Sequence, residues 1–360
     1  MRKTARKSRP VVRLAIVGAG GMVHAYVKAF QAILGCELVV VVEIDPACRE
    51  TFAKTHDISA AFVNVKDLLD AGSVDAVSVV TPDAFHAPIS IQCLRAGLHV
   101  MCEKPLALNH PEARRMVAEA KKAGRINMVN FSYRSWSCIH AAAKAVHSGR
   151  IGELRHVEAS YLQSWLSSKA WGDWRTSPQW LWRLSTRHGS AGVLGDIGVH
   201  IIDFVTYPAG PIRSVFARLK AFPKAPRNRV NGYVLDANDS AVLNVDFVNG
   251  ALGTIHATRW AAGHVNRLYL KISGTLGSVE IDTERSTTSY RLCDGEHIHT
   301  ASWREVEAPP TVTNYERFIS SIRKRANEQP DFARGAEIQQ VLDAGFASAK
   351  AGRPVILGRR

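Results

Sequence analysis

The chain has 360 residues, of which 46% are hydrophobic and 22% are charged, and its formal net charge is +14. That composition is typical of a globular protein, and the length is enough for two domains. The apolar stretches are only as long as strands, so we expect no membrane span. The basic residues are scattered and form no nucleic-acid-binding motif, so we expect no nucleic-acid partner.

The beginning of the chain is basic and then apolar, but no small-residue cleavage site follows the apolar part. We therefore expect residues 1–10 to form a disordered basic tail and not a secretory signal. The six cysteines include no C-x-x-C pair. In a chain of this size, that pattern predicts reduced thiols and a cytoplasmic protein.

The first third of the chain alternates between strand and helix patterns. Continuously apolar strands separated by amphipathic helices indicate βαβ units and a parallel sheet. We expect this α/β dinucleotide-binding domain to span 11–131. Strands are predicted at 12–18, 36–45, 75–82, 98–105 and 126–134, and helices at 21–34, 46–57, 86–97 and 110–124.

From about residue 151 the pattern changes to long extended segments with few helices between them. Asn249-Gly250 predicts a hairpin turn, 190–210 predicts a helix, and the end of the chain predicts two helices and a last strand. Such a pattern is typical of a large, mostly antiparallel open sheet in an α+β domain. We expect this second domain to span 132–360 and to bind substrate and a second copy of the chain.

A glycine pattern lies between the first strand and the first helix. Gly18 permits a tight turn, and Gly20 lets the backbone approach a pyrophosphate at the helix N-terminus. The third position is usually Gly or Ala and is Val23 here, so an ordinary βα turn remains the alternative interpretation. We expect Gly18, Gly20, Gly21 and Met22 to contact a dinucleotide.

The second strand ends in Glu43, which follows Val23 by 43 − 23 = 20 residues. An acidic residue at about this spacing accepts hydrogen bonds from the adenosine ribose hydroxyls and repels a 2′-phosphate. Glu43 therefore favours NAD(H) over NADP(H), although a solvated strand end would also explain it.

Taken in chain order, the motifs VGAGGM, VVTPDAFH, CEKPLAL, SGRIGELRHV and GDIGVHIID resemble those of the glucose–fructose oxidoreductase and inositol dehydrogenase family, Gfo/Idh/MocA. The resemblance covers nearly the whole chain. It implies an N-terminal Rossmann domain, a C-terminal α+β domain, and homodimers or homotetramers that pair through the open sheet. It also implies oxidation or reduction of a secondary alcohol or ketone on a sugar, inositol or derivative.

By the same resemblance Lys104 is catalytic. Its ammonium can polarise the substrate oxygen and lower the pKa of the alcohol. Glu103 is expected to orient or tune that lysine at the cofactor, or else to be a solvated carboxylate. Thr81, Pro82 and His86 are expected along the nicotinamide half of the cofactor, and a proline turn with a histidine at the helix start is the alternative.

Asp196, His200 and Asp203 recur at helical spacing and so share one face of a helix. The resemblance implies that Asp196 and His200 face the substrate. We expect His200 to act as general base or acid, because its ordinary pKa of ~6.5 lies near working pH. Asp196 would bind a neighbouring hydroxyl and stabilise the imidazolium. A polar face in solvent is the alternative, and without a third ligand we expect no metal.

The segment 160–190 holds five of the eight tryptophans of the chain, together with several basic residues. Aromatic faces stack on sugar rings and basic side chains donate to hydroxyls, but tryptophans also pack interfaces. We keep both interpretations. The residues expected to bind a ring-sized polyol or sugar are Arg134, Trp165, Arg175, Trp182, Arg183, Asp196 and His200.

The leading functional prediction is an NAD(H)-dependent oxidoreductase that transfers hydride to or from a sugar, glycoside or cyclitol. One alternative is redox-assisted glycoside chemistry, in which C3 is oxidised and the cofactor is recycled. Another is a non-catalytic NAD-binding regulator, against which the joint presence of Lys104, Asp196 and His200 argues.

Overall fold

A computed structural model describes residues 10–358, so the expected tail lies outside the described residues except for Pro10. The chain forms two compact units. The first comprises the chain up to Ser132 together with Val312–Gln339, and the second comprises Tyr133–Thr311 and the chain from Gln340 onward. The segment 312–339, which the sequence analysis placed in the second domain, therefore belongs to the first unit.

The first unit is built on a six-stranded parallel sheet with the order β3-β2-β1-β4-β5-β6. The strand order reverses between β1 and β4, which is the place where ligands bind in open α/β sheets. The parallel Rossmann-type sheet expected from the sequence is thus present. Its strands are β1 (Val12–Val17), β2 (Cys36–Val42), β3 (Ala60–Phe62), β4 (Ala76–Val79), β5 (His99–Cys102) and β6 (Asn127–Val129).

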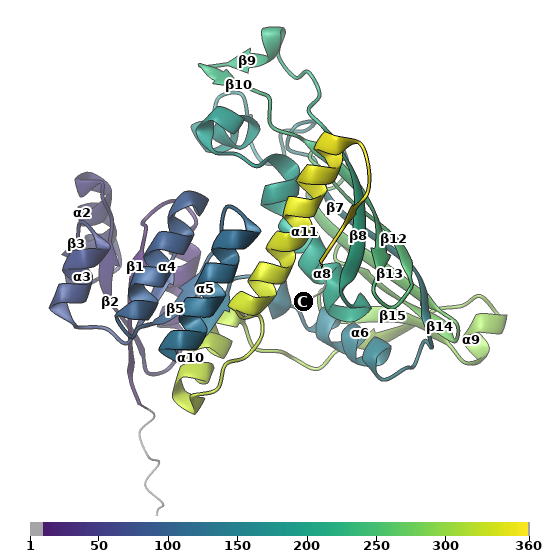
Figure 1. Ribbon diagram of the computed structural model, residues 1–360, viewed down its shortest axis with the longest axis horizontal. Coiled ribbons are helices and arrows are strands. Elements are labelled where there is room, and N and C mark those ends of the chain that lie inside the picture. Colours follow the sequence, from purple (N-terminus) through teal and green to yellow (C-terminus); the bar gives the residue numbers. More distant parts are fainter. Residues whose placement is uncertain (1–9, 359–360) are drawn as a thin grey trace, which may run out of the picture. The chain divides into compact units, whose positions relative to one another are not determined.

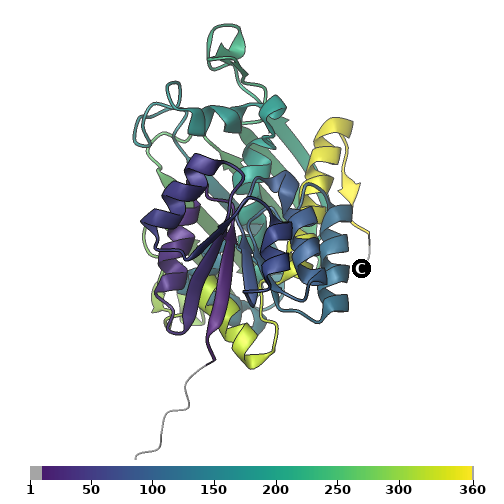
Figure 2. The ribbon, with the colours of Figure 1, turned by 90° about the vertical axis from the view of Figure 1, so that its left-hand side faces the viewer.

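Helices cover both faces of this sheet (Figure 2). Helices α4 and α5 pack together on one side, while α1 packs with α10. The short elements β3 and α3 were not predicted. The helices are α1 (Val23–Gln31), α2 (Pro46–Thr55), α3 (Val65–Ala71), α4 (His86–Arg95), α5 (His110–Ala123) and α10 (Asn314–Lys324).

Helix α10 belongs to the first unit because its apolar side chains complete the core of that unit. Phe318 and Ile319 are fully buried in the same cluster as Phe30 of α1. Tyr315 packs edge-on against Tyr26 with ring centroids 5.1 Å apart. Burying aromatic and aliphatic side chains of this size contributes about 1.5–3 kcal/mol each.

The second unit is built on a nine-stranded sheet with the order β16-β15-β14-β13-β7-β12-β11-β8-β17. Its neighbouring strands are antiparallel except for β7 and β12, as expected, and the predicted Asn249-Gly250 turn joins β11 to β12. The strands are β7 (Leu154–Gln163), β8 (Ile212–Lys220), β11 (Ser240–Phe247), β12 (Leu252–Thr258), β13 (Asn266–Gly274), β14 (Gly277–Asp282), β15 (Ser289–Asp294), β16 (Arg304–Glu307) and β17 (Val355–Ile356).

Helices α6 (Ser137–His147) and α8 (Val199–Ala209) pack against one face of this sheet (Figure 1). The sequence analysis missed α6. The last helix, α11 (Phe332–Ala351), begins in the first unit and ends in the second. The remaining short elements are α7 (Pro178–Leu181), the two-stranded ribbon of β9 (Arg229–Val230) and β10 (Tyr233–Val234), and α9 (Glu296–His299).

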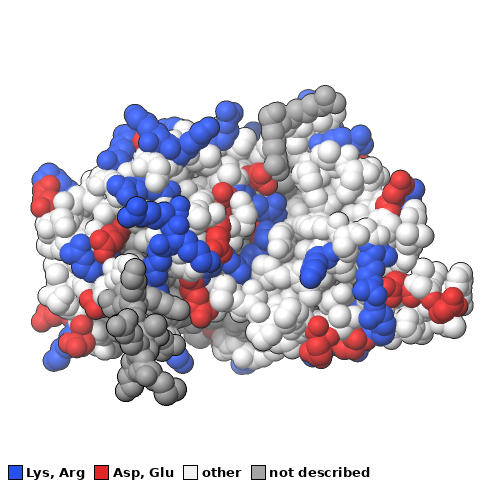
Figure 3. Space-filling model, turned by 90° about the horizontal axis from the view of Figure 1, so that it is seen from below, with Lys and Arg blue, Asp and Glu red and all other residues white. Residues whose placement is uncertain are grey.

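Within residues 10–358, no helix combines the length and the apolar character needed to cross a membrane. The cysteines are all free thiols in the structure. Figure 3 shows Lys and Arg side chains spread among Asp and Glu over the face that it displays, and not gathered in one tract.

Candidate active site

The glycine turn follows β1 at the carboxyl edge of the parallel sheet. Gly18 has a φ of +97°, and a Cβ there would lie 2.6 Å from the carbonyl oxygen of Val80, so only glycine fits. A Cβ on Gly20 or Gly21 would meet no atom within 4 Å. The turn therefore requires glycine at its first position and leaves open space above the next two, where a pyrophosphate can approach.

Glu43 lies directly after β2 and beside this turn. One carboxylate oxygen accepts the Ala19 N–H at 2.8 Å, and the other accepts the Asp45 N–H at 3.0 Å. Each oxygen of a carboxylate has a second lone pair, so both can also accept a ribose hydroxyl. Val23 is fully buried in the core, so the larger side chain at the third motif position is accommodated. The residues present fit an NAD-type dinucleotide.

His86 takes a place different from the one predicted along the cofactor. It is fully buried, and its ring nitrogens lie 2.7 Å from the Pro105 carbonyl oxygen and 2.9 Å from the Thr81 carbonyl oxygen. Burial lowers the pKa of His86, but Cys102, Asp83 and the Pro105 carbonyl outweigh burial and raise it to about 10. Because carbonyl oxygens only accept, both ring nitrogens donate, and the imidazolium ties the turn after β4 to the segment after β5.

Glu103 is likewise directed into the protein. Its carboxylate accepts hydrogen bonds from the Tyr26 hydroxyl, from Asn130 Nδ2 at 3.2 Å and from the backbone N–H of Lys104 at 2.8 Å. Burial and the charge of Glu103 raise the pKa of Tyr26 well above its usual value, so this phenol stays a donor. Glu103 therefore positions the backbone of the predicted catalytic lysine, and the sequence analysis did not identify its partners Tyr26 and Asn130.

In the second unit, the predicted catalytic helix does not begin as a regular α-helix. Leu194–Gly198 is a π-helical turn that carries Asp196, and α8 follows with His200 near its start. Single π-helical turns are rare and occur often at functional sites. His200 is buried, whereas 27% of the Asp196 side chain is exposed.

Two guanidinium groups lie against one oxygen of Asp196. Arg259, which follows β12 and is fully buried, donates to Oδ2 at 2.8 Å. Nε of Arg183 lies 3.7 Å from the same oxygen. Burial lowers the pKa of Arg259 and the charge of Asp196 opposes that effect. The sequence analysis missed Arg259, whose only local signal is a charged residue immediately after an apolar strand.

His200 is packed against two tyrosines. The ring of Tyr133 meets the imidazole edge-on with centroids 4.7 Å apart, and the ring of Tyr161 is 6.4 Å away. Burial and the neighbouring Tyr133 raise the pKa of Tyr161 well above its usual value. The Tyr161 phenol therefore holds its proton at neutral pH, and the two tyrosine rings fix the imidazole by packing and by shape.

The directions of the hydrogen bonds around these tyrosines are determined by Trp165. Its indole N–H can only donate and meets Gln163 Oε1 at 3.1 Å, so Gln163 Nε2 donates to Asn266 Oδ1 at 2.9 Å. Asn266 Nδ2 then donates to the Tyr133 hydroxyl at 3.2 Å. The Tyr161 hydroxyl donates to Asn266 Oδ1 at 2.8 Å, so Tyr133 donates to Tyr161 and the cycle closes.

The predicted substrate contact of Arg134 is not supported. Its guanidinium donates twice to the carboxylate of Asp203, with both distances 2.7 Å, and both side chains are almost completely buried. It also lies 3.6 Å above the ring of Tyr207. Both residues therefore serve the packing of α8 and not substrate recognition.

The tryptophan-rich segment divides between packing and exposed positions. Trp165 is buried in an apolar cluster with Trp174 and has a packing role, contrary to the prediction. Trp182 is 38% exposed and lies under the guanidinium of Arg183 at 4.6 Å. Arg175 covers Trp174 at 4.5 Å and is exposed to solvent. Trp182, Arg183 and Arg175 thus remain candidates for contact with a substrate.

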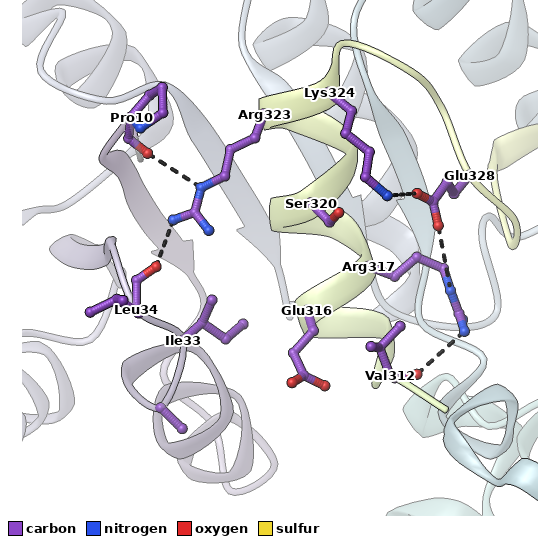
Figure 4. Close-up of a pocket in the computed structure, with 11 residues that line it drawn as sticks. Pro10, Ile33, Leu34, Val312, Glu316, Arg317, Ser320, Arg323, Lys324 and Glu328 are labelled. Carbon is purple, nitrogen blue, oxygen red and sulfur yellow. Dashed lines mark hydrogen bonds and ion pairs between the residues drawn. The ribbon is translucent and has the colours of Figure 1, made fainter. Parts of the chain in front are cut away.

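A groove of about 570 Å³ lies in the first unit between α10 and the residues after α1. Pro10, Leu34 and Arg323 are among the residues that line it, and Arg323 donates to the Leu34 carbonyl at 2.7 Å (Figure 4). Pro10 precedes β1 and Leu34 precedes β2, so the groove is at the amino ends of the strands. The glycine turn is at their carboxyl ends, and the groove is therefore not the dinucleotide site.

Two family models match the chain. The model of the oxidoreductase family with an NAD-binding Rossmann fold matches residues 12–131, and the Gfo/Idh/MocA C-terminal domain model matches residues 139–280. The chain belongs to the Gfo/Idh/MocA family. It therefore has the NAD-binding Rossmann domain of these oxidoreductases, and the resemblance noted from the motifs is confirmed.

Other Gfo/Idh/MocA proteins resemble the chain over most of their length. Levoglucosan dehydrogenase of Pseudarthrobacter phenanthrenivorans is 26% identical over 86% of this chain and 87% of its own. D-glucoside 3-dehydrogenase of Escherichia coli is 27% identical over 99% of this chain and 100% of its own.

Solved structures of related proteins have the same fold as this chain. Levoglucosan dehydrogenase in complex with NADH and levoglucosan has a TM-score of 0.86 at 26% identity, covering 97% of this chain and 100% of that one. An oxidoreductase domain protein from Kribbella flavida has a TM-score of 0.86 at 31% identity, with the same coverage.

Among the described residues, no group of three or more His, Cys, Asp or Glu side chains could hold a metal ion.

Proposed function

We propose that the protein is an NAD(H)-dependent dehydrogenase that acts on a secondary alcohol or ketone of a sugar, glycoside or cyclitol. The observation that carries the proposal is the open glycine turn with the carboxylate of Glu43 hydrogen-bonded beside it. That carboxylate favours a free 2′-hydroxyl, and so NAD(H) over NADP(H). The sugar dehydrogenases among its relatives support the substrate class.

In this proposal the side chains act on the substrate hydroxyl. His200 removes the hydroxyl proton during oxidation and returns it during reduction, while the ammonium of Lys104 stabilises negative charge on the oxygen. Asp196, held by Arg259, orients a neighbouring hydroxyl. NAD⁺ bound at the glycine turn would accept the hydride. The proposal requires the two units to bring these groups to one nicotinamide.

The residues around the cofactor site are proposed to have two kinds of role: contact with the cofactor and positioning of the neighbouring loops. Gly20, Gly21, Met22, Thr81 and Pro82 are proposed to line the cofactor, while His86 and Glu103 are proposed to position the loops around it.

Redox-assisted oxidation at C3 of a glycoside is a second candidate function, which the similarity to D-glucoside 3-dehydrogenase favours. We further propose a cytoplasmic homo-oligomer that pairs through the open sheet.

A substrate panel tests the function. The purified protein is incubated with NAD⁺ or NADP⁺ and with levoglucosan, glucosides, monosaccharides and inositols, and formation of the reduced cofactor is followed. We expect turnover with NAD⁺, and we expect Lys104→Met and His200→Asn each to lower kcat by roughly 10²–10⁴-fold. Lys121→Met on the exposed surface of α5 is the matched control.

NAD⁺ affinity is measured in parallel by calorimetry. Variants that keep NAD⁺ affinity and lose turnover support the catalytic roles. Turnover that survives in Lys104→Met would contradict the catalytic role of Lys104. NAD⁺ binding without turnover of any substrate would favour the non-catalytic NAD-binding regulator. Equal use of NADP⁺ would contradict the role of Glu43.

A further inference from the structure

A buried asparagine, Asn130, lies between helix α10 and the segment that carries Lys104. It follows β6, and its backbone N–H donates to the carbonyl of Cys102 at 2.8 Å, so it lies beside the end of β5. Asn130 is only 2% exposed. Because a buried amide must satisfy both its oxygen and its amino group, the contacts of this side chain define its role.

Helix α10 determines which way the amide of Asn130 faces. The guanidinium of Arg317 can only donate, and it meets Asn314 Oδ1 at 2.9 Å. Asn314 Nδ2 therefore donates to the Phe131 carbonyl at 2.8 Å and to Asn130 Oδ1 at 3.4 Å. The oxygen of Asn130 is thus turned toward α10, and its amino group is turned toward Glu103.

This amino group helps to hold one oxygen of Glu103. Nδ2 of Asn130 lies 3.2 Å from Glu103 Oε1, and the Tyr26 hydroxyl donates to the same oxygen. Nδ2 also lies 2.6 Å from the Tyr26 hydroxyl and 3.3 Å from that of Tyr315. With Oε1 held in this way, Oε2 is directed at the N–H of Lys104, 2.8 Å away.

The neighbouring phenols make a donor at position 130 necessary. Burial and the charge of Glu103 raise the pKa of Tyr26 well above its usual value, and burial raises the pKa of Tyr315 to about 12. Tyr26 therefore keeps its single hydrogen and gives it to Glu103, so its oxygen can only accept from Asn130. An acceptor at position 130 would face the lone pairs of both groups.

We propose that Asn130 is a positioning residue for Lys104, and that it acts by holding the carboxylate of Glu103 against the N–H of the lysine. The inference rests on the proposed dehydrogenase function, in which Lys104 is catalytic. Through Asn314 and Asn130, helix α10 then supports the catalytic segment as well as the apolar core. Small displacements of a catalytic group are sufficient to slow turnover strongly.

Asn130→Asp tests the inference, because it keeps the shape of the side chain and replaces the amino group by an acceptor. We expect kcat for the sugar that the substrate panel identifies to fall by roughly 10- to 100-fold. The NAD⁺ affinity, measured by calorimetry, should be retained. Asn127→Asp is the matched control, because Asn127 is buried at the start of the same strand and its Nδ2 donates to the Arg125 carbonyl at 3.2 Å.

The pH profile distinguishes positioning from a general loss of stability. Two carboxylates at this distance share a proton, which raises one pKa of the pair. The kcat of Asn130→Asp, relative to that of the unaltered protein, should therefore recover as the pH is lowered from about 9 to about 5, because the shared proton restores a donor. Glu103, Tyr26 and Tyr315 are the titratable groups that face this position, and Arg317 is the next charge along the network.

Asn130→Leu removes the donors without adding a charge. Its kcat should fall at every pH and should not recover in acid. If Asn130→Asp does not fold, Asn130→Leu decides the question, and an unchanged kcat in this variant overturns the inference. A relative kcat of Asn130→Asp that is independent of pH, or a loss no larger than that in Asn127→Asp, overturns it as well.

A second readout does not require turnover. In protein labelled selectively at lysine nitrogen, the backbone amide signal of Lys104 is identified by its loss in Lys104→Met. We expect this signal to shift in Asn130→Leu and to stay in place in Asn127→Asp. If no sugar is oxidised, the dehydrogenase proposal fails and this signal alone decides the positioning role; a signal that does not move in Asn130→Leu overturns it.

Discussion

Arg134 and Asp203 are 69 positions apart, yet they make two hydrogen bonds to each other inside the second unit. Asp203 stands in the same motif as Asp196 and His200, with the same helical spacing, so local pattern alone cannot distinguish their roles. Burial distinguishes them. Taking two charges out of water is costly unless each satisfies the other, so a buried pair of this geometry leaves neither group available to a ligand.

Removing one partner of this pair should therefore destabilise the fold strongly. We expect Asp203→Asn or Arg134→Met to lower the free energy of unfolding by roughly 3–5 kcal/mol, because the remaining group is left buried without its counter-charge. Urea denaturation followed by fluorescence measures the change.

The exposed pair Arg155–Glu153, 2.7 Å apart, provides the control for that experiment. Arg155→Met should change the free energy of unfolding by less than about 1 kcal/mol, as exposed ion pairs do. A small effect in both pairs would mean that the Arg134–Asp203 contact is not the stabilising interaction described above.

The sequence alone allows contacts to be predicted only between residues that are close along the chain. Gly18 and Glu43 are separated by one helix, α1, and one strand, β2, and this spacing brings Glu43 to the N–H of Ala19 beside the glycine turn. Arg259 could not be found this way, because its partner Asp196 is 63 positions away and only the pairing of β12 with its neighbours brings them together. The same holds for Asn266, which meets Tyr133 from 133 positions away.

At the scale of elements, the turn between β1 and α1 shows two different uses of glycine. At Gly18 the backbone has a positive φ that only glycine adopts easily, whereas a Cβ on Gly20 would meet no atom within 4 Å. The long strands and helices of the first unit were predictable from their apolar periodicity. The three-residue strand β3 and the short helix α3 have too few residues for periodicity to be read.

This difference gives opposite expectations for two alanine substitutions. Gly18→Ala should lower the free energy of unfolding by at least about 1–2 kcal/mol, because of its positive φ. The contact with Val80 adds further strain. Gly20→Ala should leave stability within about 0.5 kcal/mol but weaken NAD⁺ binding by roughly tenfold or more, since its methyl group occupies the approach of the pyrophosphate.

Thermal unfolding and calorimetry with NAD⁺ distinguish the two effects. If Gly20→Ala binds NAD⁺ as the unaltered protein does, the glycine turn is not the cofactor site. If Gly18→Ala is as stable as the unaltered protein, the backbone of the turn differs from the one described here.

At the scale of the whole molecule, the large sheet presents an uncovered face. In β11, Ala241 and Leu243 are buried, while Val242 between them is 44% exposed and pairs across the sheet with Arg218 and His256. An apolar residue on a broad strand surface is consistent with the proposed pairing of two copies through this face.

We expect light scattering after gel filtration to show a dimer or tetramer, and Val242→Glu to produce a smaller species, because taking a carboxylate out of water disfavours the interface. Leu34→Glu, at an exposed apolar position in the first unit, is the control. A monomeric unaltered protein, or an assembly unaffected by Val242→Glu, would refute pairing through this face.

The path of the chain has a consequence for any attempt to divide the protein. The backbone leaves the first unit after Ser132, returns at Val312 and leaves again after Gln339, so three covalent connections join the units. A fragment that stops at Ser132 would lack Tyr315, Phe318 and Ile319 and would expose the apolar side of α1 that they cover. We therefore expect nucleotide binding to appear only late in translation, because the apolar core beside α1 stays incomplete until the ribosome has supplied α10.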